Sequence, residues 1–525
     1  MRNMAAILES HRARAAQFPA AFLDDRTWND LLLDEVFAVI DRTTSTLGQH
    51  ALYHRLRRAP APAAPDAFES LTHHLSEDAA ARSRAARALR PLQDAHGYNL
   101  WWLAGGDVST PAPWKFMFPF LSAALIVAIP GGLWLHAWGL VVACMAAAWS
   151  INFATLRSND ADADALRQIA PLVRAAVSLG FLDAEGTHSL LAPLCEAPRL
   201  RGLAAIARWA SRNPLLTSPD GNFWEGIVND VFNTVYEYLN LFFLVDRTAV
   251  FFGRRHLHTH ARTIVGMVEA MGEVDAALSV AGLRADRRAW TRPAPFGGGR
   301  VRLHGVTHPL LESAVPNSID LHPPDGVLVT GSNMSGKSTF LRTIGATVVM
   351  AQSLNTCFAD FYEAPMFDIQ SVIGRADDLP AGKSYYLVEV EALLALVSAA
   401  ETGAPHLFLL DELFRGTNAV ERIAAGESVL RALVDPHGRH VAIAATHDAE
   451  LVELLDGCYA PFHFGDAVGP NGLEFSYRLT EGVATTRNAI TLLRLQGAPA
   501  SVVNRALDTA ASLDAARARS LKPEA

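Results

Sequence analysis

The stretch Thr330-Gly331-Ser332-Asn333-Met334-Ser335-Gly336-Lys337-Ser338-Thr339 decides the fold of the second half of this 525-residue chain. It fits the pattern G-x-x-x-x-G-K-[ST]. A short apolar run, Gly326 to Thr330, precedes it, and residues 339–350 continue with helical character. Strand, glycine loop and helix therefore follow one another in the order that a phosphate-binding loop requires.

The loop from Gly331 to Thr339 is predicted to bind a nucleotide. Its glycines let the backbone turn N–H groups toward the β- and γ-phosphates, Lys337 adds a positive charge there, and Ser338 can ligate Mg²⁺. A glycine turn with an incidental lysine is the alternative, but the flanking strand and helix favour phosphate binding. ATP and Mg²⁺ are therefore the predicted cofactors.

Two adjacent carboxylates, Asp411 and Glu412, end a second apolar strand that begins at His406. Asp411 is predicted to hold the Mg²⁺ shell. Glu412 would accept a proton from the water that attacks the γ-phosphate, while Lys337 and the metal stabilise the developing charge. This arrangement predicts a Mg²⁺-dependent ATPase rather than a passive nucleotide binder.

A third apolar strand, residues 440–445, ends in Thr446-His447-Asp448. His447 is predicted to sense the γ-phosphate as a third catalytic residue. A lone histidine at a strand end is more often structural, but its position after the two preceding motifs favours the catalytic interpretation.

These residues resemble the ATPase domain of MutS-type mismatch-repair proteins, a branch of the ABC ATPase superfamily. The likeness lies in Asn333 and Met334 of the loop, in the sequence Asp-Glu-Leu-Phe-Arg-Gly-Thr at 411–417, and in the Thr-His pair at 446–447. It covers roughly residues 300 to 510. The resemblance implies an α/β P-loop domain with a parallel-rich sheet, preceded by a mainly α-helical core.

Residues 377–390 look like the signature segment of the same family, with Ser384 as the matching serine. The resemblance implies that a helix N-terminus carrying Ser384 faces the nucleotide of a partner subunit. It therefore predicts a homodimer with composite sites.

No Asp, Glu, Lys or Arg occurs from Phe116 to Leu156. Each half of this run approaches the ~20 apolar residues that span a bilayer, so the run predicts a transmembrane hairpin broken at residues 129–132. Lys115 and Arg157 flank it, which predicts that both ends face the cytoplasm. The predicted localisation is the inner (cytoplasmic) membrane, with two spans, the bilayer as a partner and the ATPase domain in the cytoplasm. A helical hairpin buried in a large core is the alternative.

The predicted organisation has four parts. They are an N-terminal helical core-like region at 1–112, the membrane hairpin at 113–157, a helical core and lever region at 158–290, and the MutS-type ATPase domain with its C-terminal helices at 300–525. Residues 41–48 loosely resemble the start of the family's helical core, so we expect no mismatch-reading domain ahead of it.

Two functions remain open. The first is ATP binding and hydrolysis coupled to dimer closure, acting on mismatched or branched DNA. The second is a membrane-anchored ATPase that acts on a protein or membrane partner without mismatch recognition. The net charge of −9 and the pI of about 6.1 argue against a protein that coats nucleic acid. An ABC transporter subunit is a weaker third possibility, because the Leu-Ser-Gly-Gly-Gln signature is absent from the sequence.

Overall fold

The computed structural model describes residues 3–15, 22–58, 67–93, 117–136, 138–155, 161–183, 189–210, 243–244, 248, 251–286 and 289–520, with gaps at 254–255, 258, 295–298, 323–324, 333–334, 375–384, 435–438, 470–471 and 484–488. The chain forms two compact units, each built from three separate segments. The helical unit comprises Met1–Pro19, Ile40–Arg55 and Ala63–Asp286, and the α/β unit comprises Ala20–Val39, Leu56–Pro62 and Arg287–Ala525. The predicted division into four domains stays a prediction.

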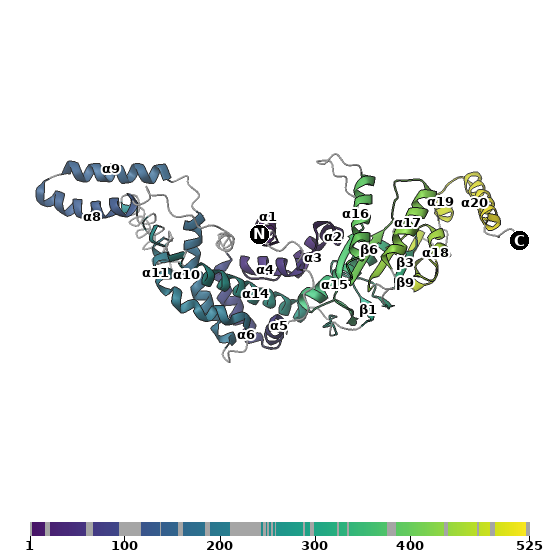
Figure 1. Cartoon of the computed structure of the whole chain (residues 1–525), viewed down its shortest axis with the longest axis horizontal. Coiled ribbons are helices and arrows are strands. Elements are labelled where there is room, and N and C mark those ends of the chain that lie inside the picture. The colour runs from purple at the N-terminus through teal and green to yellow at the C-terminus, as the bar shows by residue number, and fades with distance from the viewer. Residues whose placement is uncertain are drawn as a thin grey trace. The chain divides into compact units, whose positions relative to one another are not determined.

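Every helix or strand assigned among the described residues of the helical unit is a helix (Figure 1). These helices are α1 (Met4–Ala15), α4 (Thr46–Arg57, whose last two residues belong to the α/β unit), α5 (Ala67–Glu77), α6 (Ala79–Leu89), η2 (Arg90–Leu92), α8 (Met117–Leu135), α9 (Trp138–Thr155), α10 (Ala161–Leu179), η5 (Gly180–Asp183), η6 (Ser189–Leu200), α11 (Arg201–Ala210) and α14 (Ala261–Asp286).

Helix α14 is the centre of this unit. Its residues from Val274 to Ala281 are all buried, so other elements surround this part of the helix on every side. Asp275 lies within this stretch and accepts hydrogen bonds from Thr44 N at 2.9 Å, Ser45 N at 2.6 Å and Ser45 Oγ at 2.6 Å. The buried carboxylate therefore fixes the turn from which α4 begins.

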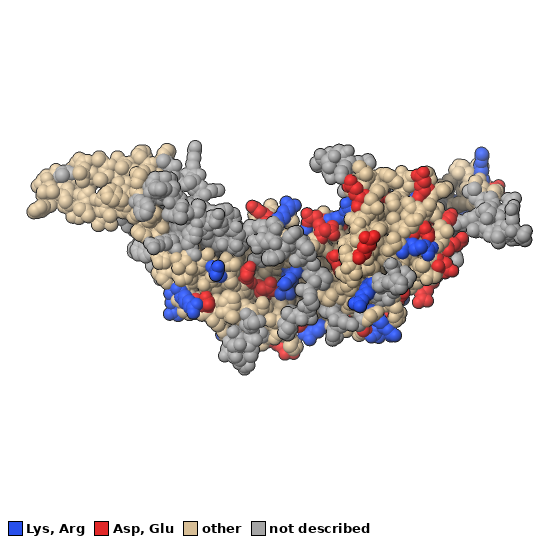
Figure 2. Space-filling model, in the orientation of Figure 1, with Lys and Arg blue, Asp and Glu red and all other residues tan. Residues whose placement is uncertain are grey.

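Helices α8 and α9 form an antiparallel hairpin, and its turn is not where the sequence predicts it (Figure 1). Pro130 lies inside α8, which continues to Leu135, and the chain reverses at His136, whose φ is 55°. Many apolar side chains of the hairpin are exposed, including Phe120 at 75% and Trp134 at 82%. Its visible face carries no acidic or basic side chain in Figure 2.

No helix among the described residues is both long and apolar enough to cross a membrane. The predicted membrane localisation with two spans is therefore wrong, and the transmembrane hairpin and the bilayer as a partner are not supported. The charge-free run extends past both helices.

The α/β unit contains two sheets. Its elements are α2 (Asp25–Asp30), α3 (Leu33–Ile40), β1 (Val301–Val306), β2 (Asn317–Leu321), β3 (Gly326–Thr330), α15 (Lys337–Leu354), β4 (Phe361–Glu363), β5 (Asp368–Val372), α16 (Tyr385–Ala400), β6 (His406–Asp411), α17 (Ala419–Leu433), β7 (Val441–Ala445), α18 (Ala449–Leu454), β8 (Tyr459–Gly469), β9 (Gly472–Glu481), α19 (Ala489–Leu495) and α20 (Ala500–Ser520).

The larger sheet has the strand order β5-β6-β7-β3-β8-β9, in which only β9 runs antiparallel to its neighbour. The smaller sheet, β2-β1-β4, is antiparallel. Strands β3 and β7 are buried along their whole length, as expected for parallel strands with both faces covered. A helical region followed by an α/β domain with a mixed, parallel-rich sheet confirms that part of the predicted fold class.

The side chain of Asp30, at the end of α2, ties the N-terminal segment of the α/β unit to β5. Its buried carboxylate accepts hydrogen bonds from Ser371 Oγ at 2.8 Å, Ile373 N at 2.9 Å and Gly374 N at 2.7 Å. Its backbone carbonyl accepts a bond from Arg342 Nε of α15 at 2.8 Å. One residue therefore fixes both the end of β5 and the helix that follows the glycine loop.

Asp30→Ala is expected to lower the free energy of unfolding of the α/β unit by about 3 kcal/mol, because three buried or half-buried donors lose their acceptor. Urea denaturation of the whole chain, followed by a probe in this unit, measures the loss. Glu35→Ala on the exposed face of α3 is the matched control and should change stability by less than about 0.5 kcal/mol. A loss below about 1 kcal/mol for Asp30→Ala would contradict this role.

The stability of the helical unit should depend on pH through Asp275. Burial raises the pKa of Asp275 to about 6, while the hydrogen bonds from Ser45 and Thr44 act in the opposite direction. The folded state therefore holds this proton to higher pH than the unfolded chain does, so the carboxyl lowers stability as pH rises from about 4 to about 6. Relative to Asp275→Asn, the unaltered chain should lose roughly 1 kcal/mol between pH 5 and pH 7. A stability difference between the two proteins that does not change with pH would contradict the assignment.

Candidate functional site

Three neighbouring parallel strands bring the candidate residues to one edge of the larger sheet. The order β6-β7-β3 places Asp411 and Val329 in register with the same residue, Ala445. The glycine loop follows β3, Glu412 follows β6, and Thr446 and His447 follow β7. Because parallel strands share one carboxyl edge, all three loops meet there.

The glycine loop has the backbone geometry that its sequence predicts. Gly331 and Gly336 have φ angles of 145° and 110°, which residues with a Cβ rarely adopt. A Cβ at Gly331 would also lie 2.9 Å from Ser335 Oγ, and α15 begins immediately after Gly336. The loop therefore directs the N-terminus of α15 toward the edge of the sheet, where an anion is favoured.

Lys337 is the first residue of α15 and lies almost completely buried inside the loop. Its Nζ donates hydrogen bonds to Gly331 O at 2.9 Å and Ser332 O at 3.0 Å. Burial lowers the pKa of Lys337, while the nearby carboxylates of Glu412 and Asp411 raise it. The amine thus lies where it can exchange carbonyl partners for phosphate oxygens.

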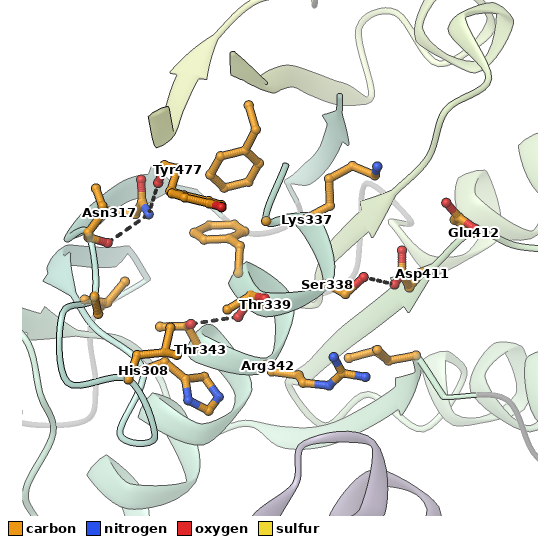
Figure 3. Close-up of a pocket in the computed structure, with 18 of the residues that line it drawn as sticks. His308, Asn317, Lys337, Ser338, Thr339, Arg342, Thr343, Asp411, Glu412 and Tyr477 are labelled. Atoms are coloured by element: carbon orange, nitrogen blue, oxygen red, sulfur yellow. Dashed lines mark hydrogen bonds between the residues drawn. The ribbon is translucent and has the colours of Figure 1, made fainter. Parts of the chain in front are cut away.

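Ser338 and Asp411 form a pair suited to a hard divalent cation. Ser338 Oγ donates to Asp411 Oδ2 at 2.5 Å, and the buried Asp411 Oδ1 has no hydrogen-bond partner among the described residues (Figure 3). Burial raises the pKa of Asp411, whereas the hydrogen bond from Ser338 lowers it. A buried carboxylate oxygen with unused acceptor capacity beside a hydroxyl fits the oxygen ligands that Mg²⁺ takes.

Glu412 lies beside this pair in an uncommon backbone conformation. Its φ is 51°, and its backbone N donates to Ala445 O at 2.9 Å. A left-handed conformation costs a residue other than glycine about 1–2 kcal/mol, so neighbouring contacts must hold it. The carboxylate accepts a hydrogen bond from Arg415 Nη1 at 2.5 Å. Sequence reasoning assigned no role to this arginine.

His447 lies near Glu412, with 3.7 Å between His447 Nδ1 and Glu412 Oε1. The next residue, Asp448, is held by two bonds from Arg422 of α17, at 2.9 Å and 2.7 Å. The loop after β7 is therefore anchored immediately beside the histidine.

A cavity of about 810 Å³ is lined by the end of the loop, Gly336 to Thr339, and by Asp411 and Glu412, and it extends beyond them (Figure 3). On its far side lie Asn317, Tyr477 and His308. The Asn317 side chain joins the two sheets, donating from Nδ2 to Tyr477 O at 3.0 Å and accepting from Leu479 N at 2.7 Å. Burial lowers the pKa of His308 to about 4, so its imidazole is neutral near pH 7.

The structure thus brings Lys337, Ser338, Asp411 and Glu412 to one cavity, with His447 within 4 Å of Glu412. Asn333, Met334 and Ser384 lie outside the described residues. Sequence reasoning missed Tyr477, which is on an edge strand and has no motif around it. Asn317, the first residue of β2, was likewise not among the predicted site residues.

Comparison with known proteins matches the α/β unit to the family that its sequence motifs resemble. Residues 327–514 match the family MutS domain V. The DNA mismatch repair protein MutS 2 of Halobacterium salinarum is 32% identical over 274 residues, which are 50% of this chain and 31% of that protein. DNA mismatch repair protein MutS of Thermus thermophilus is 32% identical over 274 residues, covering 51% of this chain and 33% of that protein. MutS of Shouchella clausii is 33% identical over 265 residues, covering 48% and 30%.

The chain spans about a third of the length of these curated relatives. Homology to MutS proteins therefore extends over about half of this chain, including the glycine loop and both carboxylates.

Proposed function

We propose that this chain, about half of which is homologous to MutS proteins, binds ATP with Mg²⁺ and hydrolyses it. The observation that carries the proposal is the convergence of a buried loop lysine, a hydroxyl-carboxylate pair and a second carboxylate in one cavity. A passive phosphate site needs the loop but has no use for the second carboxylate.

Each residue has a distinct part in this reaction. Ser338 and Asp411 would hold Mg²⁺, which neutralises phosphate charge when bound. Lys337 would donate to the phosphate oxygens in place of the carbonyls of Gly331 and Ser332. Glu412 would take a proton from the attacking water.

Glu412 must give up part of its present bonding before it can act as a base. The hydrogen bond from Arg415 pairs the carboxylate of Glu412 with a positive charge, and Arg415 also lines the cavity. A phosphate in the cavity offers this arginine a competing anion, which would free Glu412 for the water. His447 would orient the carboxylate from its other oxygen.

Lys337→Ala and Glu412→Gln should separate binding from chemistry. Lys337→Ala is expected to weaken binding of a fluorescent ATP analogue by about tenfold or more. Glu412→Gln should bind the analogue within about twofold of the unaltered chain, yet lose turnover by about a hundredfold, because the phosphate and metal contacts survive without the base. Glu401→Gln, on an exposed turn away from the cavity, is the control. Wild-type turnover by Glu412→Gln would show that another group is the base.

We further propose that hydrolysis serves work on mismatched or branched DNA. The support is the homology over half of the chain to proteins named as DNA mismatch repair proteins. This homology does not favour the alternative of an ATPase that acts on a protein partner and has lost DNA recognition. A homodimer in which Ser384 faces the partner's nucleotide is part of the same proposal.

DNA binding should be measured as fluorescence anisotropy with perfect, mismatched and branched duplexes at about 50 mM and 200 mM salt, with and without ATP. The proposal predicts tighter binding to mismatched or branched DNA than to the perfect duplex, with an affinity that falls as salt rises. If none of the three duplexes binds detectably at the lower salt, the proposal of DNA binding is overturned, whereas the proposal of ATP hydrolysis stands.

A further inference from the structure

Helix α16 lies against the turn that carries Glu412, and two of its residues face that turn. Glu389 Oε1 accepts a hydrogen bond from Phe414 N at 2.7 Å. A Cβ placed at Gly416 would lie 3.9 Å from Cδ2 of Tyr386. Residues 386 and 389 are three positions apart and therefore share one face of the helix.

The turn from Glu412 to Phe414 needs such support. Both end residues are left-handed, with φ angles of 51° and 53°, and neither is a glycine. Contacts on both sides hold this conformation. Glu412 N is held by Ala445 O of β7 at 2.9 Å, and Phe414 N is held by Glu389 of α16. Strand β7 thus anchors the first left-handed residue and helix α16 anchors the second.

Glu389 does not act on a nucleotide directly. It is 4% exposed, and it is not among the described residues that line the cavity. Its side chain instead accepts a hydrogen bond from the backbone N–H of Phe414. The direction in which the Glu412 side chain leaves the turn depends on the turn's backbone, so a buried residue outside the cavity controls the geometry of one inside it.

We propose that Glu389 is a positioning residue that holds Glu412 in place for hydrolysis through its hydrogen bond to Phe414 N. The inference rests on the proposed function, ATP hydrolysis with Glu412 as the base. The same helix begins at Tyr385, directly after Ser384. Any displacement of α16 along its axis would therefore move Glu389 and change the position of Glu412.

Four variants of the full chain test this role. Glu389→Met fills a similar volume but removes the acceptor. Glu389→Asp keeps the charge but shortens the reach by one methylene, and it remains informative if the Met variant fails to fold. Glu389→Gln keeps an oxygen that can accept from Phe414 N. Glu391→Met removes a charge from the exposed side of the same helix and is the matched control.

The kcat of ATP hydrolysis and the Kd of a fluorescent ATP analogue are measured for each variant. Glu389→Met and Glu389→Asp should lose about tenfold or more in kcat, with a Kd within about twofold of the unaltered chain. Glu389→Gln should recover kcat to within about threefold, and Glu391→Met should match the unaltered chain.

Two results would overturn the inference while leaving the proposed function standing. One is an unchanged kcat in Glu389→Met or Glu389→Asp, and the other is a loss of affinity in parallel with kcat, which indicates collapse of the whole site. Absence of hydrolysis in the unaltered chain would instead overturn the proposed function itself, and this inference with it.

Discussion

Parallel pairing of β6, β7 and β3 is the constraint on which the site depends. The three segments that carry the glycine loop, Glu412 and His447 are separated by tens of residues, and only their strands bring them together. The pairing also buries both faces of these strands, which explains their uninterrupted apolar sequences. The same hydrogen-bonded ladder therefore produces the core of the α/β unit and the edge at which nucleotide chemistry can occur.

Three buried carboxylates in the described structure accept hydrogen bonds from the backbone of a turn or loop. Asp275 holds the turn before α4, Asp30 holds the residues that follow β5, and Glu389 holds the turn after β6. In each case backbone N–H groups outside a helix or strand ladder find an acceptor in a side chain from another element. Asp30 thus holds Ile373 and Gly374, which line the cavity, and Glu389 holds the turn that carries Glu412, although neither acid lines the cavity itself.

The order of elements and the main candidate residues could be predicted because their signals are local. A glycine loop between a strand and a helix, or a carboxylate pair after an apolar run, is visible within about twenty residues of sequence. Asp30 and Ser371 are 341 positions apart, and nothing in either neighbourhood indicates that they meet. Tyr477 reaches the cavity through the pairing of β8 with β9, which a motif search does not reveal.

For the hairpin of α8 and α9 the error was of another kind, because a local absence of charge was interpreted as a membrane span. The uncharged run from Phe116 to Leu156 does contain two helices, α8 and α9, but composition does not say where they begin, turn and end. Pro130 and the glycines after it suggested a turn, yet α8 passes through them, although an interior proline removes a helical hydrogen bond and crowds the preceding turn. The turn lies at His136, beyond these residues.

The central claim is that the cavity at the carboxyl edge of the sheet is a Mg²⁺-nucleotide site. The most direct test is an experimental structure of the chain with Mg²⁺ and a non-hydrolysable ATP analogue. The account predicts phosphates within the loop from Gly331 to Thr339, Lys337 Nζ turned from the carbonyls to the phosphates, and a metal about 2.1 Å from Ser338 Oγ in place of its hydrogen bond to Asp411. An analogue bound elsewhere, with the Ser338 to Asp411 hydrogen bond intact, would contradict it.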